Sequence, residues 1–240
     1  MEALEIKTIF TLVLFDYQIP ITETIVISWA VMIILIIASV ILTRKLKTIP
    51  AGSQALLEAG MEFLNNFSKN HFGYLAKYLG PYMGTVFLFL LVSCIIPVFS
   101  PVELRIFGHE FIPLFHIRPV ARDINVTASL ALISILLVLV CGFAVRGPIG
   151  WLKNFLYPVP LMLPFNIMEY ATRLISLALR LFGNILGAFV LMHLIERLMP
   201  VGLPAIFSLY FDFFDGLLQA GIFVFLSSLY ISEAVKVHAQ

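Results

Sequence analysis

The sequence predicts an all-α integral membrane protein. Of its 240 residues, 61% are apolar and 12% are charged, whereas a soluble domain has about 45–50% and about 25%. The mean hydropathy of +1.03 implies more apolar surface than one core of this size can cover, so much of that surface must face lipid. Several apolar runs also reach the roughly 20 residues that a helix needs to cross the hydrocarbon layer.

About five membrane helices and one interfacial helix are expected in a single membrane domain, residues 1–240. Three upright spans are expected at 22–43, 81–98 and 124–145. The intervening segment 53–77 mixes charged side chains with regularly spaced apolar ones, and this amphipathic pattern predicts a helix on the membrane surface.

The last third of the chain is expected to form a long helical hairpin. Its two arms, 161–199 and 204–237, are separated by Pro200 and Pro204, where one helix must stop and the next begin. Because each arm is longer than an upright span requires, both should be strongly tilted.

The distribution of lysine and arginine predicts the orientation. Eight of these residues fall in segments expected inside and four in segments expected outside, which favours an outside N-terminus and a cytoplasmic C-terminus. The inside set is Arg44, Lys45, Lys47, Lys69, Lys77, Arg146, Lys153 and Lys236, and the outside set is Lys7, Arg105, Arg118 and Arg122. The acidic start of the chain does not resemble a signal peptide, so the first apolar stretch is expected to be retained.

Composition argues against several functional classes. A net charge of +1 offers no basic excess for nucleic acid. Two cysteines, Cys94 and Cys141, exclude a disulfide framework. The five histidines show no metal-ligand spacing, so no metal or other cofactor is expected.

A polar stripe follows one face of the first hairpin arm. Its members recur at steps of three and four residues, as one helical face requires: Glu169, Arg173, Ser176, Arg180, Asn184 and Gly187. A buried arginine stays charged and is costly in a membrane without partners or water. Glu169 can pair with Arg173 four residues on, whereas Arg180 has no acid within one turn, so its partner should come from elsewhere.

The second arm carries Asp212, Asp215 and Gln219, which α-helical spacing would put on one face. Antiparallel pairing about the turn puts Asn184 opposite Gln219 and brings the two aspartates near the outer side. Carboxylates at that level suggest an aqueous inlet leading toward Arg180.

Several strings resemble subunit a of F-type ATP synthases. The most specific are PFNIME at 164–169 and SLALRLFGNI at 176–185. Further matching strings occur in the same order as in that family: GPYMGTVFLF at 80–89, DINVTASLAL at 123–132 and LQAGIF at 218–223.

The resemblance implies a non-catalytic, ion-translocating stator subunit pressed against a rotating ring of c subunits. Two half-channels would reach the ring carboxylate, and Arg180 would match the family's essential arginine. Gln219 and Asn184 would match polar residues beside that arginine. Glu169 would match the family's polar entry on the cytoplasmic side. Implied partners are the c-ring, b-type peripheral stalk subunits, the F1 head that performs the ATP chemistry, lipid, and translocated H⁺ or Na⁺. A bacterial plasma membrane is favoured over an organellar inner membrane.

The chain departs from the family pattern at two positions. Phe189 stands where many members have Glu or His, and Cys94 where many have Asn. Asp212 could replace the missing polar group across the hairpin.

Alternative interpretations of several polar residues stay open. Arg173 and Glu169 could form only a structural pair, and Asp212 and Asp215 could mark a solvated helix end. Gln219 could simply hydrogen-bond a neighbouring helix.

Two other functional classes compete. An independent secondary ion transporter or channel would also use an intramembrane arginine with carboxylates, but the chain shows no inverted repeats. A membrane-embedded hydrolase has no support from a Gly-x-Ser-x-Gly or His-Glu-x-x-His motif.

Overall fold

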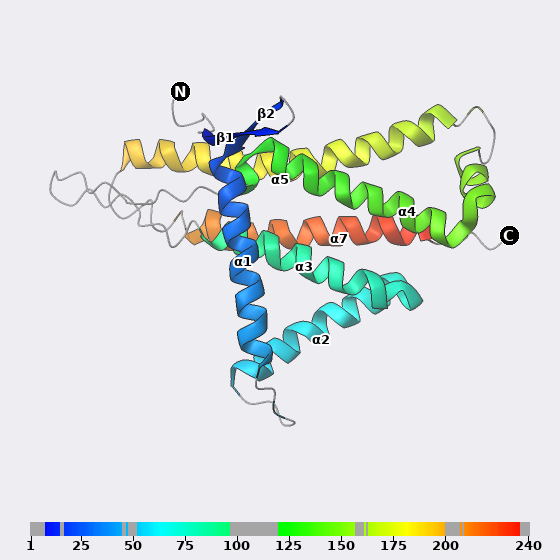
Figure 1. The fold of residues 1–240 in the computed structure, drawn as a ribbon, viewed down its shortest axis with the longest axis horizontal. Coiled ribbons are helices and arrows are strands. Elements are labelled where there is room, and N and C mark those ends of the chain that lie inside the picture. The colour runs from blue at the N-terminus through cyan, green and yellow to red at the C-terminus, as the bar shows by residue number, and fades with distance from the viewer. Residues whose placement is uncertain are drawn as a thin grey trace. The chain divides into compact units, whose positions relative to one another are not determined.

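The helical membrane architecture is confirmed by the computed structural model, which describes residues 8–14, 17–44, 47, 52–96, 120–156, 161, 163–199, 207 and 209–235. Five helical stretches in this part of the chain are long and apolar enough to cross a membrane (Figure 1). They are Glu23–Thr43, Leu57–Ile95, Ile124–Trp151, Leu163–Met192 and Phe213–Val235. In the 18-residue apolar part of each stretch, between 6% and 44% of the residues are buried. Most of these side chains are therefore left to face lipid.

The first helices differ in how their apolar residues are arranged. Helix α1 (Glu23–Thr43) is apolar on nearly every side, with exposed isoleucines such as Ile36 and Ile41, as a lipid-surrounded span requires. Helix α2 (Ser53–Phe72) is amphipathic. A short 3₁₀ turn, η2 (Gly73–Leu75), joins α2 to α3 (Ala76–Ile95), and Gly73 has a φ of +55°, a conformation that glycine adopts without steric cost.

The later helices are longer. A short 3₁₀ turn, η4 (Val120–Arg122), precedes α4 (Ile124–Leu156). Helix α4 is kinked at Gly147, which has a φ of +69° and is followed by Pro148. Helix α5 (Leu163–Leu198) runs for 36 residues. A π-helical segment (Leu209–Asp215) leads into α7 (Gly216–Val235).

A β-hairpin at the start of the described chain was not expected from the sequence. Strand β1 (Thr8–Leu14) pairs antiparallel with β2 (Tyr17–Thr22), directly before α1. Strand β1 contains β-branched Thr, Ile and Val, and β2 contains Ile and Thr; such residues favour extended structure. Pro20 lies opposite Thr11 and is tolerated because both strands of a two-stranded sheet are edge strands.

Internal contacts divide the chain into two compact units. The first comprises Met1–Lys45, Leu88–Val126 and Phe182–Gln219. In it, the buried Asp123 stands before α4 and accepts hydrogen bonds from the Asn125 backbone N–H at 2.9 Å and from Thr24 Oγ1 at 2.8 Å. One carboxylate thus caps α4 and ties its start to the start of α1.

The second unit comprises Leu46–Phe87, Thr127–Leu181 and Ala220–Gln240. Its buried apolar side chains come from α2, α3, α4, α5 and α7: Phe72, Leu79, Met83, Val86, Ala131, Ile135, Val138, Leu177, Ala178, Leu181, Ala220, Phe223, Val224 and Ile231. One polar contact also joins two of these helices, since Tyr82 on α3 and Ser134 on α4 share a hydrogen bond of 3.4 Å.

Candidate functional site

The predicted polar stripe lies on one helix. Because α5 has no break between Leu163 and Leu198, the spacing of Glu169, Arg173, Ser176, Arg180 and Asn184 does put them on one face. Glu169, Ser176 and Arg180 are exposed, and Arg173 and Asn184 are half-buried.

The two arginines of this face differ in their partners. Arg180 forms no hydrogen bond or ion pair with any residue that the structure describes. Arg173, by contrast, is paired with two carboxylates. Arg180 is therefore the guanidinium on this face that is available to a group from another chain.

The surface beside Arg180 is open. A Cβ atom added to Gly183 or to Gly187 would have no heavy atom of the described chain within 4 Å. These glycines lie three and seven residues after Arg180, on the same helical face. Small residues in such a position let a second helix backbone approach closely in a membrane.

Asn184 and Gln219 contact each other, as antiparallel pairing predicts. Asn184 Nδ2 donates to Gln219 Oε1 at 3.4 Å, a long hydrogen bond by ordinary standards. Gln219 is 3% exposed, and its Nε2 has no hydrogen-bond partner among the described residues. The contact is confirmed, and it leaves one buried donor of Gln219 unused.

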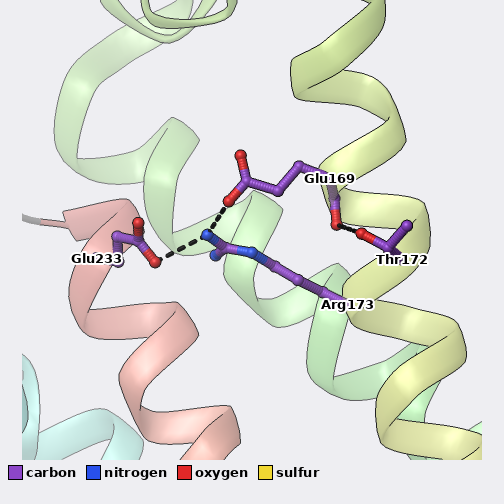
Figure 2. A network of polar contacts seen from close by, with 4 residues as sticks. All are labelled: Glu169, Thr172, Arg173 and Glu233. Atoms are coloured by element: carbon purple, nitrogen blue, oxygen red, sulfur yellow. Dashed lines mark hydrogen bonds and ion pairs between the residues drawn. The ribbon is translucent and has the colours of Figure 1, made fainter.

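The Glu169–Arg173 pair has a third member, Glu233 of α7. Figure 2 shows the Arg173 guanidinium between the two carboxylates, with Nη2 donating to Glu169 Oε1 and to Glu233 Oε2, the latter at 2.8 Å. The Arg173 side chain is 15% exposed, against 52% for Glu169 and 64% for Glu233. Its guanidinium also lies 4.8 Å from the Tyr230 ring centroid, a cation–π distance.

Glu233 was not among the candidate site residues. The register that pairs Asn184 with Gln219 also pairs Arg173 with Tyr230, which is observed. Glu233 lies three residues beyond Tyr230, less than one turn along the same helix. Applying the pairing to Arg173 would therefore have found this carboxylate.

The aspartates of the second arm stand in the π-helical segment. The assumption of α spacing through Asp212 and Asp215 was wrong there, because i→i+5 hydrogen bonding puts more residues in each turn and rotates these two positions relative to each other. Asp215 is half-buried. The side chain of Asp212 lies outside the described residues.

Cys94, one of the two departures from the family pattern, packs against the start of α7. A Cβ added to Gly216 would lie 2.5 Å from Cys94 Cβ, far closer than van der Waals contact. Cys94 is 6% exposed. A small residue at 216 is therefore what lets these two backbones come together.

Within the described ranges, no cluster of three or more His, Cys, Asp and Glu side chains has the arrangement of a metal site. The polar groups on α5 and α7 are instead a guanidinium without a partner, an amide pair and a charged cluster.

Comparison with known proteins decides the family. The profile described as the ATP synthase A chain matches residues 25–232, most of the sequence. The chain belongs to this family. It is also similar to a protein named ATP synthase subunit a, sodium ion specific, from Propionigenium modestum, with 33% identity over 223 residues that cover 91% of this chain and 76% of that protein.

Family membership settles the general function. The chain is an integral membrane, ion-translocating stator component of the membrane sector of a rotary F-type ATP synthase, and it acts within a multi-subunit complex. An independent ion transporter is not favoured, because the match extends over nearly all the spans.

Proposed function

We propose that Arg180 meets the ion-binding carboxylates of a rotating c-ring, one after another, at the open face of α5. The observation that carries this proposal is the contrast between an exposed Arg180 without a partner and an Arg173 paired twice. A guanidinium that must bind a passing carboxylate and release it cannot have a permanent partner of its own. Gly183 and Gly187 support the proposal, since they leave room for a ring helix.

Arg180 would perform two tasks. Its fixed positive charge disfavours the direct passage of a cation between the two half-channels, because a cation beside a guanidinium in a low-dielectric site is strongly repelled. The same charge attracts a ring carboxylate that has lost its ion. Asn184 and Gln219 would orient the arginine and hold water, Ser176 and Glu169 would line the cytoplasmic side, and Asp212 and Asp215 the outer side.

The proposal extends to the surroundings of the chain. Residues 1–240 would act as one membrane domain in a bacterial plasma membrane, with the N-terminus outside and the C-terminus cytoplasmic. Its partners would be the c-ring, b-type peripheral stalk subunits and the F1 head, which performs the ATP chemistry. The coupling ion would be H⁺ or Na⁺, and the carboxylate that selects between them belongs to the ring rather than to this chain. The sodium specificity in the name of the relative makes Na⁺ a concrete candidate.

Cross-linking tests the proposed surface. Gly187→Cys would be introduced into the complex after Cys94 and Cys141 are changed to Ser, and a short thiol cross-linker applied to membranes carrying one cysteine in the outer ring helix. The control is Ile175→Cys, 54% exposed but on the far side of α5. Cross-linking to the c subunit is expected from residue 187 and not from residue 175; the reverse pattern, or none from 187, would refute the proposal.

A further inference from the structure

Arg173 lies on the same face of α5 as Arg180. The two arginines are seven residues apart on one continuous helix, which is two turns or about 10 Å. Because α5 is expected to be strongly tilted, part of this separation would lie along the path of ring carboxylates that pass the helix. Both guanidiniums keep their charge in a protein. An unpaired Arg173 would therefore be a second group that a passing carboxylate could bind.

Arg173 is covered and paired in the structure. Its Nη2 donates to Glu169 of α5 and to Glu233 of α7 (Figure 2). The guanidinium carbon lies 4.8 Å from the ring centroid of Tyr230 and 5.8 Å from that of Tyr170. These neighbours leave the Arg173 side chain 15% exposed, so a carboxylate from another chain has little access to it.

The charges around Arg173 balance. Tyr170 lies within electrostatic range of four charged side chains, which are those of Arg146, Arg173, Glu169 and Glu233. Two are guanidiniums and two are carboxylates, so their formal charges sum to zero. Neutralising Glu233 would leave this group with a net positive charge next to the face that carries Arg180.

We infer that Glu233, together with Glu169, sequesters Arg173, so that ring carboxylates bind at Arg180 and not two turns away. Glu169 alone would hold Arg173 weakly, because an exposed pair four residues apart on one helix is worth little. The carboxylate from α7 adds a second acceptor. Arg173 must then break two hydrogen bonds before it can bind a carboxylate of another chain.

This role makes Glu233 a positioning residue. Its carboxylate acts through Arg173 and determines which of two guanidiniums on α5 is available to the ring. The inference rests on the proposed function, because it concerns competition for the same ring carboxylates.

The test is ATP-driven ion pumping in inverted vesicles at matched complex levels. Glu169→Gln/Glu233→Gln removes both partners of Arg173 and should slow pumping about five-fold, because a partly exposed ion pair can hold a carboxylate by about that factor. Glu233→Gln alone should slow pumping less, since Glu169 remains. Glu62→Gln, which neutralises an exposed carboxylate of α2 outside the cluster, is the matched control and should pump at the wild-type rate.

A further substitution separates sequestration from a structural tie between α5 and α7. Adding Arg173→Gln to either slowed variant removes the freed guanidinium and should raise the pumping rate again. If the cluster only held the two helices together, removing its central residue as well would leave the rate as low or lower. Glu233→Asp keeps the carboxylate and should pump close to the wild-type rate.

Two results would overturn the inference. One is wild-type pumping by Glu169→Gln/Glu233→Gln. The other is a failure of Arg173→Gln to raise the rate of either slowed variant. Arg180→Ala, assayed in parallel, separates the two claims. Pumping retained by Arg180→Ala would refute the proposed function, whereas pumping lost there, without rescue by Arg173→Gln in the glutamate variants, would refute only the role of Glu233.

Discussion

Asn184 of α5 donates a hydrogen bond to the buried side chain of Gln219 of α7, at 3.4 Å. The second polar atom of that glutamine, Nε2, has no partner among the described residues. A buried donor without a partner is costly, so its presence beside the polar face of α5 indicates a functional rather than a stabilising role. Water or a group from a partner chain would satisfy it in the assembled complex.

Replacing Gln219 should affect ion flux more than assembly. Gln219→Leu removes the contact with Asn184 and also removes the unsatisfied donor, and these two effects on stability oppose each other. We expect complex levels close to wild type and a clear decrease in ATP-driven ion pumping. Unchanged flux with an unchanged pH dependence would show that the glutamine serves only in packing.

Asp212 is expected to supply the polar relay of the outer half-channel in place of Phe189. Asp212→Asn should therefore reduce ATP-driven pumping more than Asp215→Asn does, because the relay needs a negative oxygen facing water. Adding Phe189→Glu to the Asp212→Asn chain should restore part of the rate. Full pumping by Asp212→Asn at matched complex levels would place the outer path elsewhere.

The contact between Gly216 and Cys94 should make position 216 intolerant of any side chain. Gly216→Ala would place Cβ 2.5 Å from Cys94 Cβ, so the helices must shift, at a cost of about 1–3 kcal/mol for such overpacking. The matched control is Gly221→Ala on the same helix, where an added Cβ meets no atom of the described chain within 4 Å. Thermal unfolding of the purified complex should show a lower midpoint for Gly216→Ala only; equal midpoints would contradict this packing.

The parts of the fold set by local hydrophobicity could be predicted from the sequence. A run of about 20 apolar residues has few alternatives to a membrane helix, and α1 matches such a run from Glu23 to Thr43. The Asn184–Gln219 contact could also be predicted, because a turn at known residues fixes which levels of two antiparallel helices meet.

The rest depends on packing between distant segments or on subtle backbone changes. Glu233 lies 60 residues from Arg173, and an acid near the end of a helix usually indicates only a solvated surface. The π-helical segment Leu209–Asp215 is rich in aromatic residues, but it arises from one shifted hydrogen-bond register, which such a composition does not reveal. The closeness of Gly216 to Cys94 likewise depends on two helices meeting.

ATP synthesis by vesicles carrying Arg180→Ala tests the central claim most directly. An imposed ion gradient drives synthesis at matched complex levels, with Arg197→Ala, an exposed arginine at the end of the same helix, as the control. We expect no coupled synthesis from Arg180→Ala, little from Arg180→Lys, which loses the planar fork of donors, and wild-type synthesis from Arg197→Ala. Wild-type synthesis by Arg180→Ala would contradict the account.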